Sequence, residues 1–282
     1  MSAAGLLLWA WTPFGRLSVP ALYEGLSTRA FTAEGLWLNL GFWRDARTIE
    51  QACPALALRV AEAAGMGPSD EVVDVGFGFA DQDMLWAERI GPRRITGLNV
   101  TPLHVRLGRA RVRRRGLTGV IDLREGSATA MPLPDACCDV VTAVECAFHF
   151  DTREAFFAEA FRVLRPGGRL ALADIIRAPG QGLAARLSWA AMADRFRVPA
   201  ANAVTREAYA AQLAAAGFAE AAVAPIGPDV FPGWHAALRQ DAALRARLPR
   251  ALRAPAAALA RLNPATVYSG LDYVLAVARK PA

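Results

Sequence analysis

A carboxylate followed by two glycines stands in the segment Val72-Val-Asp74-Val-Gly76-Phe-Gly78-Phe-Ala80. An apolar strand that runs into such a turn brings bare backbone against a ligand that a Cβ would exclude. A dinucleotide fingerprint would need Gly or Ala where this chain has Asp81, whose carboxylate would repel a pyrophosphate. Asp74 instead suits a cationic cofactor, and S-adenosylmethionine carries both a sulfonium and an ammonium group.

His149 is the candidate catalytic residue, because it follows closely on the strand expected to end at Glu145. A hydroxyl that accepts a methyl group must lose its proton, and an unperturbed imidazole titrates near neutral pH. We therefore expect His149 to act as general base, with turnover falling below about pH 6.5. The alternative is a histidine that only packs between Phe148 and Phe150. No metal is expected, because the cysteines and histidines lack ligand spacing.

Strands and helices alternate from about residue 70, and these elements would position the residues above. Strands are expected at 71–75, 94–99, 120–124, 139–145 and 169–175, helices at 82–90, 102–115 and 152–164, and later strands at 218–225 and 273–279. The alternation predicts an α/β fold with a doubly wound, Rossmann-like, mostly parallel sheet. Ligands of such sheets bind at the carboxyl ends of the strands.

The two ends of the chain are predicted to add helices to this sheet. Residues 1–65 would form an N-terminal helical cap, in which Trp37 and Trp43 could close over a substrate. Residues 66–282 would form the cofactor-binding domain, with helical insertions near 180–200 and 230–262. The arginines between 109 and 115 are expected to cover a solvated helix face.

Composition limits the class of protein. The 282 residues are 54% hydrophobic and 21% charged, which excludes a disordered chain. No apolar run reaches about 18 residues, and no basic residue precedes the apolar segment 6–11, so we expect neither a membrane span nor a signal peptide and place the protein in the cytoplasm. The net charge of +6 lies in residues 231–282, where a solvated helix face is expected.

Several short motifs together indicate a family. They are Asn39-Leu-Gly-Phe-Trp43, Asp74-Val-Gly-Phe-Gly78, Gln82-Asp83, Thr101-Pro102, Gly126-Ser-Ala-Thr129, Phe148-His-Phe150 and Leu271-Asp-Tyr-Val274. In this order they resemble the class I S-adenosylmethionine-dependent methyltransferases, most closely the small-molecule O-methyltransferases of the erythromycin mycarosyl O-methyltransferase type. The resemblance implies transfer of a methyl group to a hydroxyl of a sugar or polyketide-type natural product, in secondary metabolism. The second product would be S-adenosylhomocysteine.

The resemblance also assigns roles to matching residues. Asp74, Gly76 and Gly78 would line the methionine part of the cofactor, with Glu145 near the same end. Asn99 would take the ribose and Ser127 would face the adenine, although relatives mostly carry an acid at both places. Gln82, Val100 and Ala128 would complete the cofactor site.

Other functions stay open at this point. The acceptor could be a nitrogen, a carbon or a lipid, or the chain could be a catalytically silent cofactor-binding subunit. Nucleic acid is not expected, because Glu145-Cys-Ala-Phe148 replaces the Asn/Asp-Pro-Pro-aromatic turn of amino-methylating DNA enzymes and no Pro-Cys pair exists. The expected partner is a small molecule, with no stable membrane insertion, and a homo-oligomer is left open.

Overall fold

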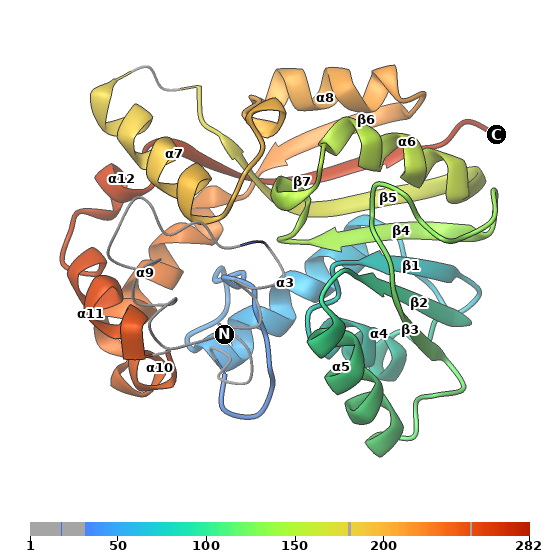
Figure 1. Cartoon of the computed structure of the whole chain (residues 1–282), viewed down its shortest axis with the longest axis horizontal. Helices are drawn as coiled ribbons and strands as arrows, with labels where there is room; N and C mark the ends of the chain where they lie inside the picture. Colours follow the sequence, from blue (N-terminus) through green and yellow to red (C-terminus); the bar gives the residue numbers. More distant parts are fainter. Residues whose placement is uncertain (1–17, 19–31, 180–181, 249) are drawn as a thin grey trace.

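The computed structural model describes Ser18 and residues 32–179, 182–248 and 250–282. Within these ranges the chain builds a seven-stranded sheet in the order β3-β2-β1-β4-β5-β7-β6 (Figure 1). The strands are β1 (Glu71–Val75), β2 (Arg94–Asn99), β3 (Ile121–Glu125), β4 (Cys138–Val144), β5 (Leu164–Arg177), β6 (Ala219–Pro225) and β7 (Leu271–Arg279). β1 to β5 run parallel, and β7 is antiparallel to both β5 and β6. The predicted α/β, mostly parallel sheet is confirmed.

The strands lie close to their predicted positions because their apolar runs are buried on both faces, as parallel strands require. In β1, Val72, Val73 and Val75 are all buried. One prediction was wrong: the fifth strand was expected to begin at residue 169. It instead begins at Leu164 and includes Pro166-Gly167-Gly168, and its pairing with β4 shifts register across these residues.

Helices cover both faces of the sheet. On one face lie α3 (Ile49–Ala63), α4 (Asp81–Arg89) and α5 (Pro102–Arg114), and on the other lie α6 (Arg153–Val163) and α8 (Arg206–Ala215) (Figure 1). α3 packs its buried side into the same core as the sheet, and Trp86 of α4 donates its indole N–H to the Ala57 carbonyl at 3.0 Å. Helices on both faces confirm the doubly wound arrangement.

The remaining helices gather at one end of the molecule, on the left of Figure 1. They are α7 (Leu183–Arg195), α9 (Phe231–Gln240), α10 (Ala242–Arg247), α11 (Arg250–Leu259) and α12 (Pro264–Val267), with short 3-10 turns at Ala147–His149, Ala200–Asn202 and Gly227–Asp229. α7 and α9–α11 occupy the regions where helical insertions were predicted. Residues 1–17 and 19–31 of the predicted cap, which include the apolar segment 6–11, lie outside the described residues.

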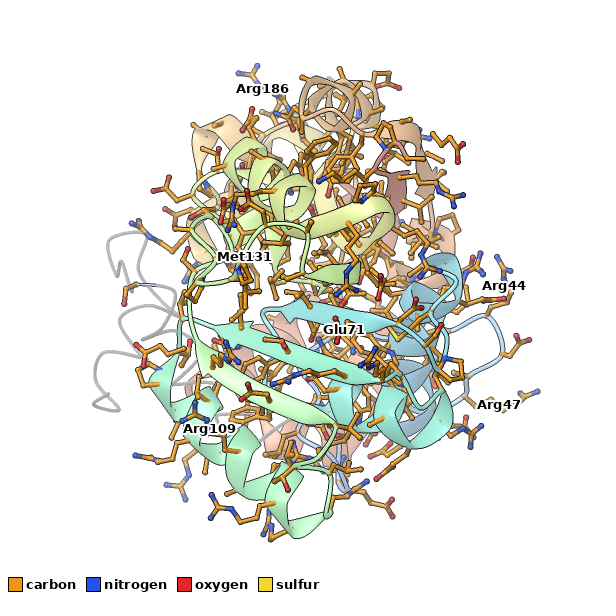
Figure 2. The ribbon with its side chains drawn as sticks, turned by 90° about the vertical axis from the view of Figure 1, so that its right-hand side faces the viewer. Arg44, Arg47, Glu71, Arg109, Met131 and Arg186 are labelled. Atoms are coloured by element: carbon orange, nitrogen blue, oxygen red, sulfur yellow. The ribbon has the colours of Figure 1, made fainter. Side chains whose placement is uncertain are left out.

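The basic C-terminal region uses much of its charge internally. Arg245 donates to the carbonyls of Leu238 and Arg239, and Arg253 donates to those of Ala246 and Leu248. Elsewhere, Arg44, Arg47 and Arg186 point away from the body of the molecule (Figure 2). Among the helices of the described ranges, none is long and apolar enough to cross a membrane.

Candidate active site

A cavity of about 230 Å³ opens where β1, β2, β3 and β4 end. Its walls are the turns that follow these four strands, together with the segment 36–39 from the N-terminal region. The predicted site residues on these walls are Trp37, Gly76, Gly78, Gln82, Asn99, Val100, Ser127, Ala128, Glu145 and His149. Asp74 and Trp43 do not line it. The strand order reverses between β1 and β4, so the cavity lies at the topological switch point where open sheets bind ligands.

The glycine turn after β1 forms one wall of the cavity and needs its glycines. Gly76 has φ +75° and Gly78 has φ +56°, in the left-handed region that residues with a Cβ avoid. A Cβ on Gly76 would also lie 2.6 Å from the Cys146 sulfur. The turn therefore presents backbone to the cavity, as a close-fitting ligand requires. Ala80, two residues on, has φ +66° despite its Cβ.

We expect the variant G76A to bind S-adenosylmethionine at least about tenfold more weakly, since the turn must move away from Cys146. G116A is its matched control, because Gly116 has φ +70° but nothing within 4 Å of the position of a Cβ. Both variants should lose roughly 1–2 kcal/mol of stability from left-handed backbone. Calorimetric titration checks the difference, and equal affinities in the two variants would refute the role given to Gly76.

Asp74 lies behind the cavity wall. Its carboxylate is fully buried and accepts hydrogen bonds from Thr142 Oγ1 at 2.7 Å and from Gln82 Nε2 at 2.9 Å. Burial raises the pKa of Asp74 to about 7, against the opposing effect of these two bonds. Because Gln82 does line the cavity, Asp74 is placed to orient the Gln82 amide toward a ligand.

Asp81 is a site residue whose partners the sequence did not reveal. It lines the cavity at the start of α4, and the Leu36 backbone N–H donates to its carboxylate at 3.2 Å. Arg111 of α5 binds the same carboxylate through both guanidinium nitrogens, at 2.5 and 2.6 Å. Arg111 is only 12% exposed, so its assignment to a solvated face was wrong. The ion pair compensates the charge of Asp81 and holds the segment at Leu36 against the cavity.

The walls beyond β2 and β3 hold polar and aromatic groups. The Asn99 side-chain oxygen accepts from the Thr101 backbone N–H at 2.9 Å. The Ser127 and Thr129 hydroxyls are hydrogen-bonded at 2.9 Å. His104, for which no site role was predicted, also lines the cavity, with its ring 4.2 Å from that of Phe79. Its place in the first turn of α5, directly after the end of β2, is the sequence signal that could have found it.

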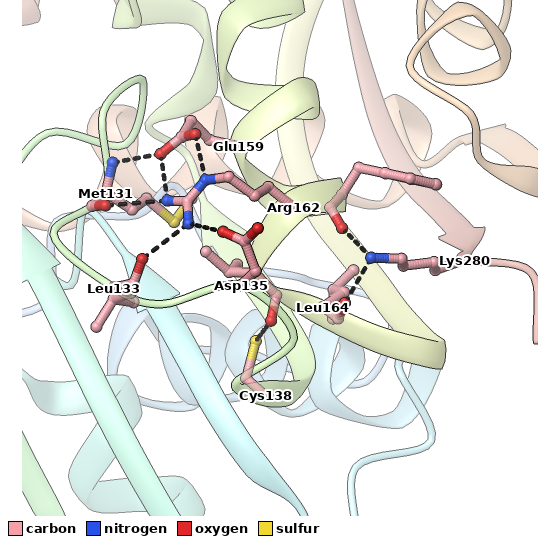
Figure 3. Close-up of polar contacts among 10 residues, drawn as sticks. Met131, Leu133, Asp135, Cys138, Glu159, Arg162, Leu164 and Lys280 are labelled. Atoms are coloured by element: carbon pink, nitrogen blue, oxygen red, sulfur yellow. Dashed lines mark hydrogen bonds and ion pairs between the residues drawn. The ribbon is translucent and has the colours of Figure 1, made fainter.

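The loop between β3 and β4, which begins with these cavity residues, is fixed by one arginine of α6 (Figure 3). Arg162 donates to the carbonyls of Met131 and Leu133 and forms ion pairs with Asp135 and Glu159. Glu159 in turn accepts from the Met131 backbone N–H at 2.6 Å. Arg162 and Glu159 of α6 thus hold the loop at Met131 and Leu133, which do not themselves line the cavity.

Glu145 follows directly on β4 and lines the cavity with φ +52°. One carboxylate oxygen accepts from the Leu40 backbone N–H at 2.7 Å and from the Tyr273 hydroxyl at 2.5 Å. Burial raises the pKa of Glu145 to about 7, although both hydrogen bonds act to lower it. A carboxylate that titrates near neutrality therefore stands in the wall of the cavity.

His149 lies in the 3-10 turn after Glu145 and faces the same cavity. Its ring centroid is 4.2 Å from that of Phe148 and 6.3 Å from that of Phe196, the residue that follows α7. Burial among these rings lowers the pKa of His149 to about 3. The expectation of a near-normal pKa was therefore wrong, and the reason to expect an activity loss near pH 6.5 from His149 no longer holds.

The two tryptophans predicted to contact substrate lie differently. Trp37 forms part of the cavity wall. Trp43 donates its indole N–H to the Leu40 carbonyl at 2.8 Å, and its ring packs so closely on Gly233 of α9 that a Cβ there would be 2.2 Å away. Trp43 thus ties the N-terminal segment to α9 and stays outside the cavity. Among the described residues, no group of three or more His, Cys, Asp or Glu side chains could hold a metal.

Comparison with known proteins agrees with this fold. A family model for a methyltransferase domain matches residues 73–172. Erythromycin 3''-O-methyltransferase from Saccharopolyspora erythraea is 41% identical over 212 residues, covering 72% of this chain and 68% of the relative. The 27-O-demethylrifamycin SV methyltransferase from Amycolatopsis mediterranei is 29% identical over 268 residues, covering 92% and 96%. The crystal structure of the (4+2) cyclase SpnF superposes with a TM-score of 0.70 at 21% identity, covering 94% and 98%, which shows the fold alone.

The parallel sheet with its antiparallel β7, and the glycine turn at its switch point, define a class I methyltransferase. With the likeness to an O-methyltransferase over most of both chains, this chain belongs to the S-adenosylmethionine-dependent small-molecule O-methyltransferases. The predicted family and cofactor are confirmed, with S-adenosylhomocysteine as the second product.

Proposed function

We propose that the methyl acceptor is a hydroxyl group on a sugar or a polyketide-type small molecule. The 41% identity to a relative named for 3''-O-methylation of erythromycin carries this proposal. The cavity is compatible with it, since the described residues of its walls include no lysine or arginine to bind a phosphate. A small molecule, rather than nucleic acid or membrane, is therefore the proposed partner.

The cavity walls fit the cofactor. S-adenosylmethionine supplies a methyl group that is activated by its attachment to a sulfonium. Gly76, where a Cβ would clash with Cys146, and Gly78 would lie against the methionine part, and Gln82, held by Asp74, would bind there too. Asn99 and Val100 would face the ribose, and Ser127 and Ala128 the adenine. Glu145 adds a negative charge to the cavity when ionised, which favours a cation.

We assign the proton transfer to His149. With its pKa lowered to about 3, the imidazole is neutral throughout the physiological range and can accept a hydrogen bond from the acceptor hydroxyl. A weak base is sufficient here, because the proton becomes strongly acidic as the oxygen gains its bond to carbon. Trp37, which also lines the cavity, would help to exclude water.

The acceptor class can be tested by supplying the protein with S-adenosylmethionine and matched compounds. A glycosylated macrolactone should yield S-adenosylhomocysteine, whereas its derivative with the sugar hydroxyls blocked should not. A phosphorylated alcohol and an amine of similar size serve as controls. Faster turnover of the amine than of the alcohol would indicate that the protein methylates nitrogen instead of oxygen. Binding of the cofactor without turnover of any acceptor class would support the alternative of a catalytically silent subunit.

We also propose a cytoplasmic location. The four cysteines Cys53, Cys137, Cys138 and Cys146 are all free thiols. Two of them are adjacent in sequence, and free thiols are the normal state in a reducing compartment.

A further inference from the structure

Tyr273 connects β7, the last strand in the sequence, to the active site. It lies in β7, at 0% exposure, and its ring packs edge-on against that of Phe231 in α9. Its hydroxyl donates to Glu145 Oε1 at 2.5 Å, across 128 residues of sequence. Tyr273 does not itself line the cavity, so it can act there only through Glu145.

The same oxygen of Glu145 also holds the N-terminal segment. It accepts from the Leu40 backbone N–H at 2.7 Å, immediately after the wall residues Leu36 to Asn39. The Leu40 carbonyl in turn accepts from the Trp43 indole, which is packed on α9. At its other end, the wall segment is held by the bond from Leu36 to Asp81. Two carboxylates, Glu145 directly after β4 and Asp81 at the start of α4, therefore fasten this wall of the cavity.

The backbone at Glu145 indicates that this arrangement is specific. A non-glycine residue at φ +52° occupies an unfavourable conformation, which persists only where the surrounding contacts impose it. Here the conformation lets the side chain, 9% exposed, reach both donors while it remains on the cavity wall. Loss of one donor should release part of that constraint.

We propose that Tyr273 is a positioning residue for cofactor binding: by donating to Glu145, it keeps this carboxylate aimed at Leu40, and so holds the 36–40 wall against the bound cofactor. The proposal concerns the cofactor, which family membership establishes, and it rests on the proposed function only in using the same cavity. It does not depend on which acceptor is methylated.

Burial and the groups around Glu145 determine whether its pKa is raised or lowered. The titratable groups that act on it or lie beside it are Tyr273 of β7, Asp174 of β5, Cys53 of α3, and Cys146 and His149 on its own connection. Burial and Asp174 raise the pKa of Glu145, and the bonds from Tyr273 and Leu40 lower it, with a result of about 7. Asp174 is itself paired with Arg153. Removing the Tyr273 hydroxyl must therefore raise the pKa of Glu145 further.

The cofactor carries a positive sulfonium and the product a neutral sulfur, so ionised Glu145 should favour S-adenosylmethionine over S-adenosylhomocysteine. In the wild type, affinity for S-adenosylmethionine should increase as the pH rises through about 7. In Y273F the midpoint should lie about one pH unit higher. At pH 7 the ionised fraction would then fall from about one half to about one tenth, and the apparent affinity about fivefold.

The test is calorimetric titration of the full chain with S-adenosylmethionine and with S-adenosylhomocysteine between pH 6 and 9. Y209F is the matched control, because Tyr209 is also fully buried and its hydroxyl donates to a carboxylate, Asp174, at 3.1 Å. It should destabilise the fold comparably and leave the pH midpoint of binding unchanged. E145Q should lose the part of the pH dependence that comes from Glu145, since its amide oxygen still accepts from Leu40 but does not ionise, while Asp74, whose pKa is also about 7, is retained in all of these variants.

An upward shift of the midpoint in Y273F, absent from Y209F and abolished in Y273F/E145Q, is the expected result. A midpoint in Y273F equal to that of the wild type would overturn the proposal, as would the same shift in Y209F. Unfolding curves at each pH distinguish these results from misfolding. Because this test measures cofactor binding, a negative result would not argue against hydroxyl methylation. A negative result in the acceptor test would likewise not argue against the role of Tyr273.

Discussion

The variant H149A is expected to lose about 10²- to 10⁴-fold in kcat while its affinity for S-adenosylmethionine stays within about twofold of the wild type. The imidazole lies on the cavity wall, where it can accept the proton of a hydroxyl, and it is carried by the 3-10 turn after β4 rather than by the glycine turn after β1. Single-turnover measurement of methyl transfer, beside calorimetric titration of the cofactor, separates the two quantities.

H235A provides the matched control for H149A. His235 is 4% exposed in α9, packs edge-on against Tyr268 and is not part of the cavity wall. It should lose stability through the same truncation and retain kcat. A kcat for H149A equal to that of H235A would remove His149 from the mechanism. In the wild type, kcat should show no loss due to His149 between pH 5 and 8, because the pKa of that imidazole is lowered to about 3.

The largest expected effect on stability comes from the buried arginine behind His149. Arg153 is 0% exposed and donates to Asp174 Oδ2 at 2.8 Å, to the Ile175 carbonyl at 2.8 Å and to the Asn202 carbonyl at 2.5 Å. We expect R153M to lower the free energy of unfolding by about 3–5 kcal/mol, because it leaves the Asp174 carboxylate buried without its counter-ion. Urea unfolding monitored by circular dichroism measures the change.

The exposed pair Arg59–Glu62 is the control, with side chains 39% and 72% exposed. R59M should change stability by no more than about 1 kcal/mol. The double variant R153M/D174N should recover part of the loss, since it removes the uncompensated charge. If R153M is as stable as R59M, the buried ion pair is not the support that the structure indicates.

R153M should also reduce kcat in the fraction that stays folded. Asn202, which Arg153 holds through both its backbone N–H and its guanidinium, donates to the carbonyls of Phe148 and Phe150 on either side of His149. Arg153 therefore fixes the turn that carries the imidazole. Without Arg153 this turn would become more mobile, and His149 would be positioned less accurately for proton transfer.

Local patterns were enough to predict the sheet, the glycine turn and ten of the twelve catalytic, cofactor and substrate residues as cavity neighbours, because the strand ends of a parallel sheet meet at one edge. Contacts between distant segments left no such pattern. Nothing in the spacing links Arg111 to Asp81 or Tyr273 to Glu145, and each depends on how two elements cross in space. The packing of Trp43 on Gly233 is of the same kind.

The titration of His149 was mispredicted for a related reason. A pKa depends on the environment that the folded chain builds around the group, and here the rings of Phe148 and Phe196 come from separate segments. From the sequence alone, His149 was expected to titrate near neutral pH and Glu145 was expected only to contact the cofactor. In the structure, burial instead raises the pKa of the two carboxylates Asp74 and Glu145 to about 7 and lowers that of His149 to about 3.

Methylation of a hydroxyl group is tested most directly by locating the transferred methyl group on the product. The protein would be incubated with S-adenosylmethionine labelled with ¹³C in its methyl group and with a glycosylated polyketide alcohol, and the product examined by NMR. We predict a labelled methoxy group, with a long-range correlation to the proton on the oxygen-bearing carbon of the acceptor. A label attached to nitrogen or to carbon would contradict it.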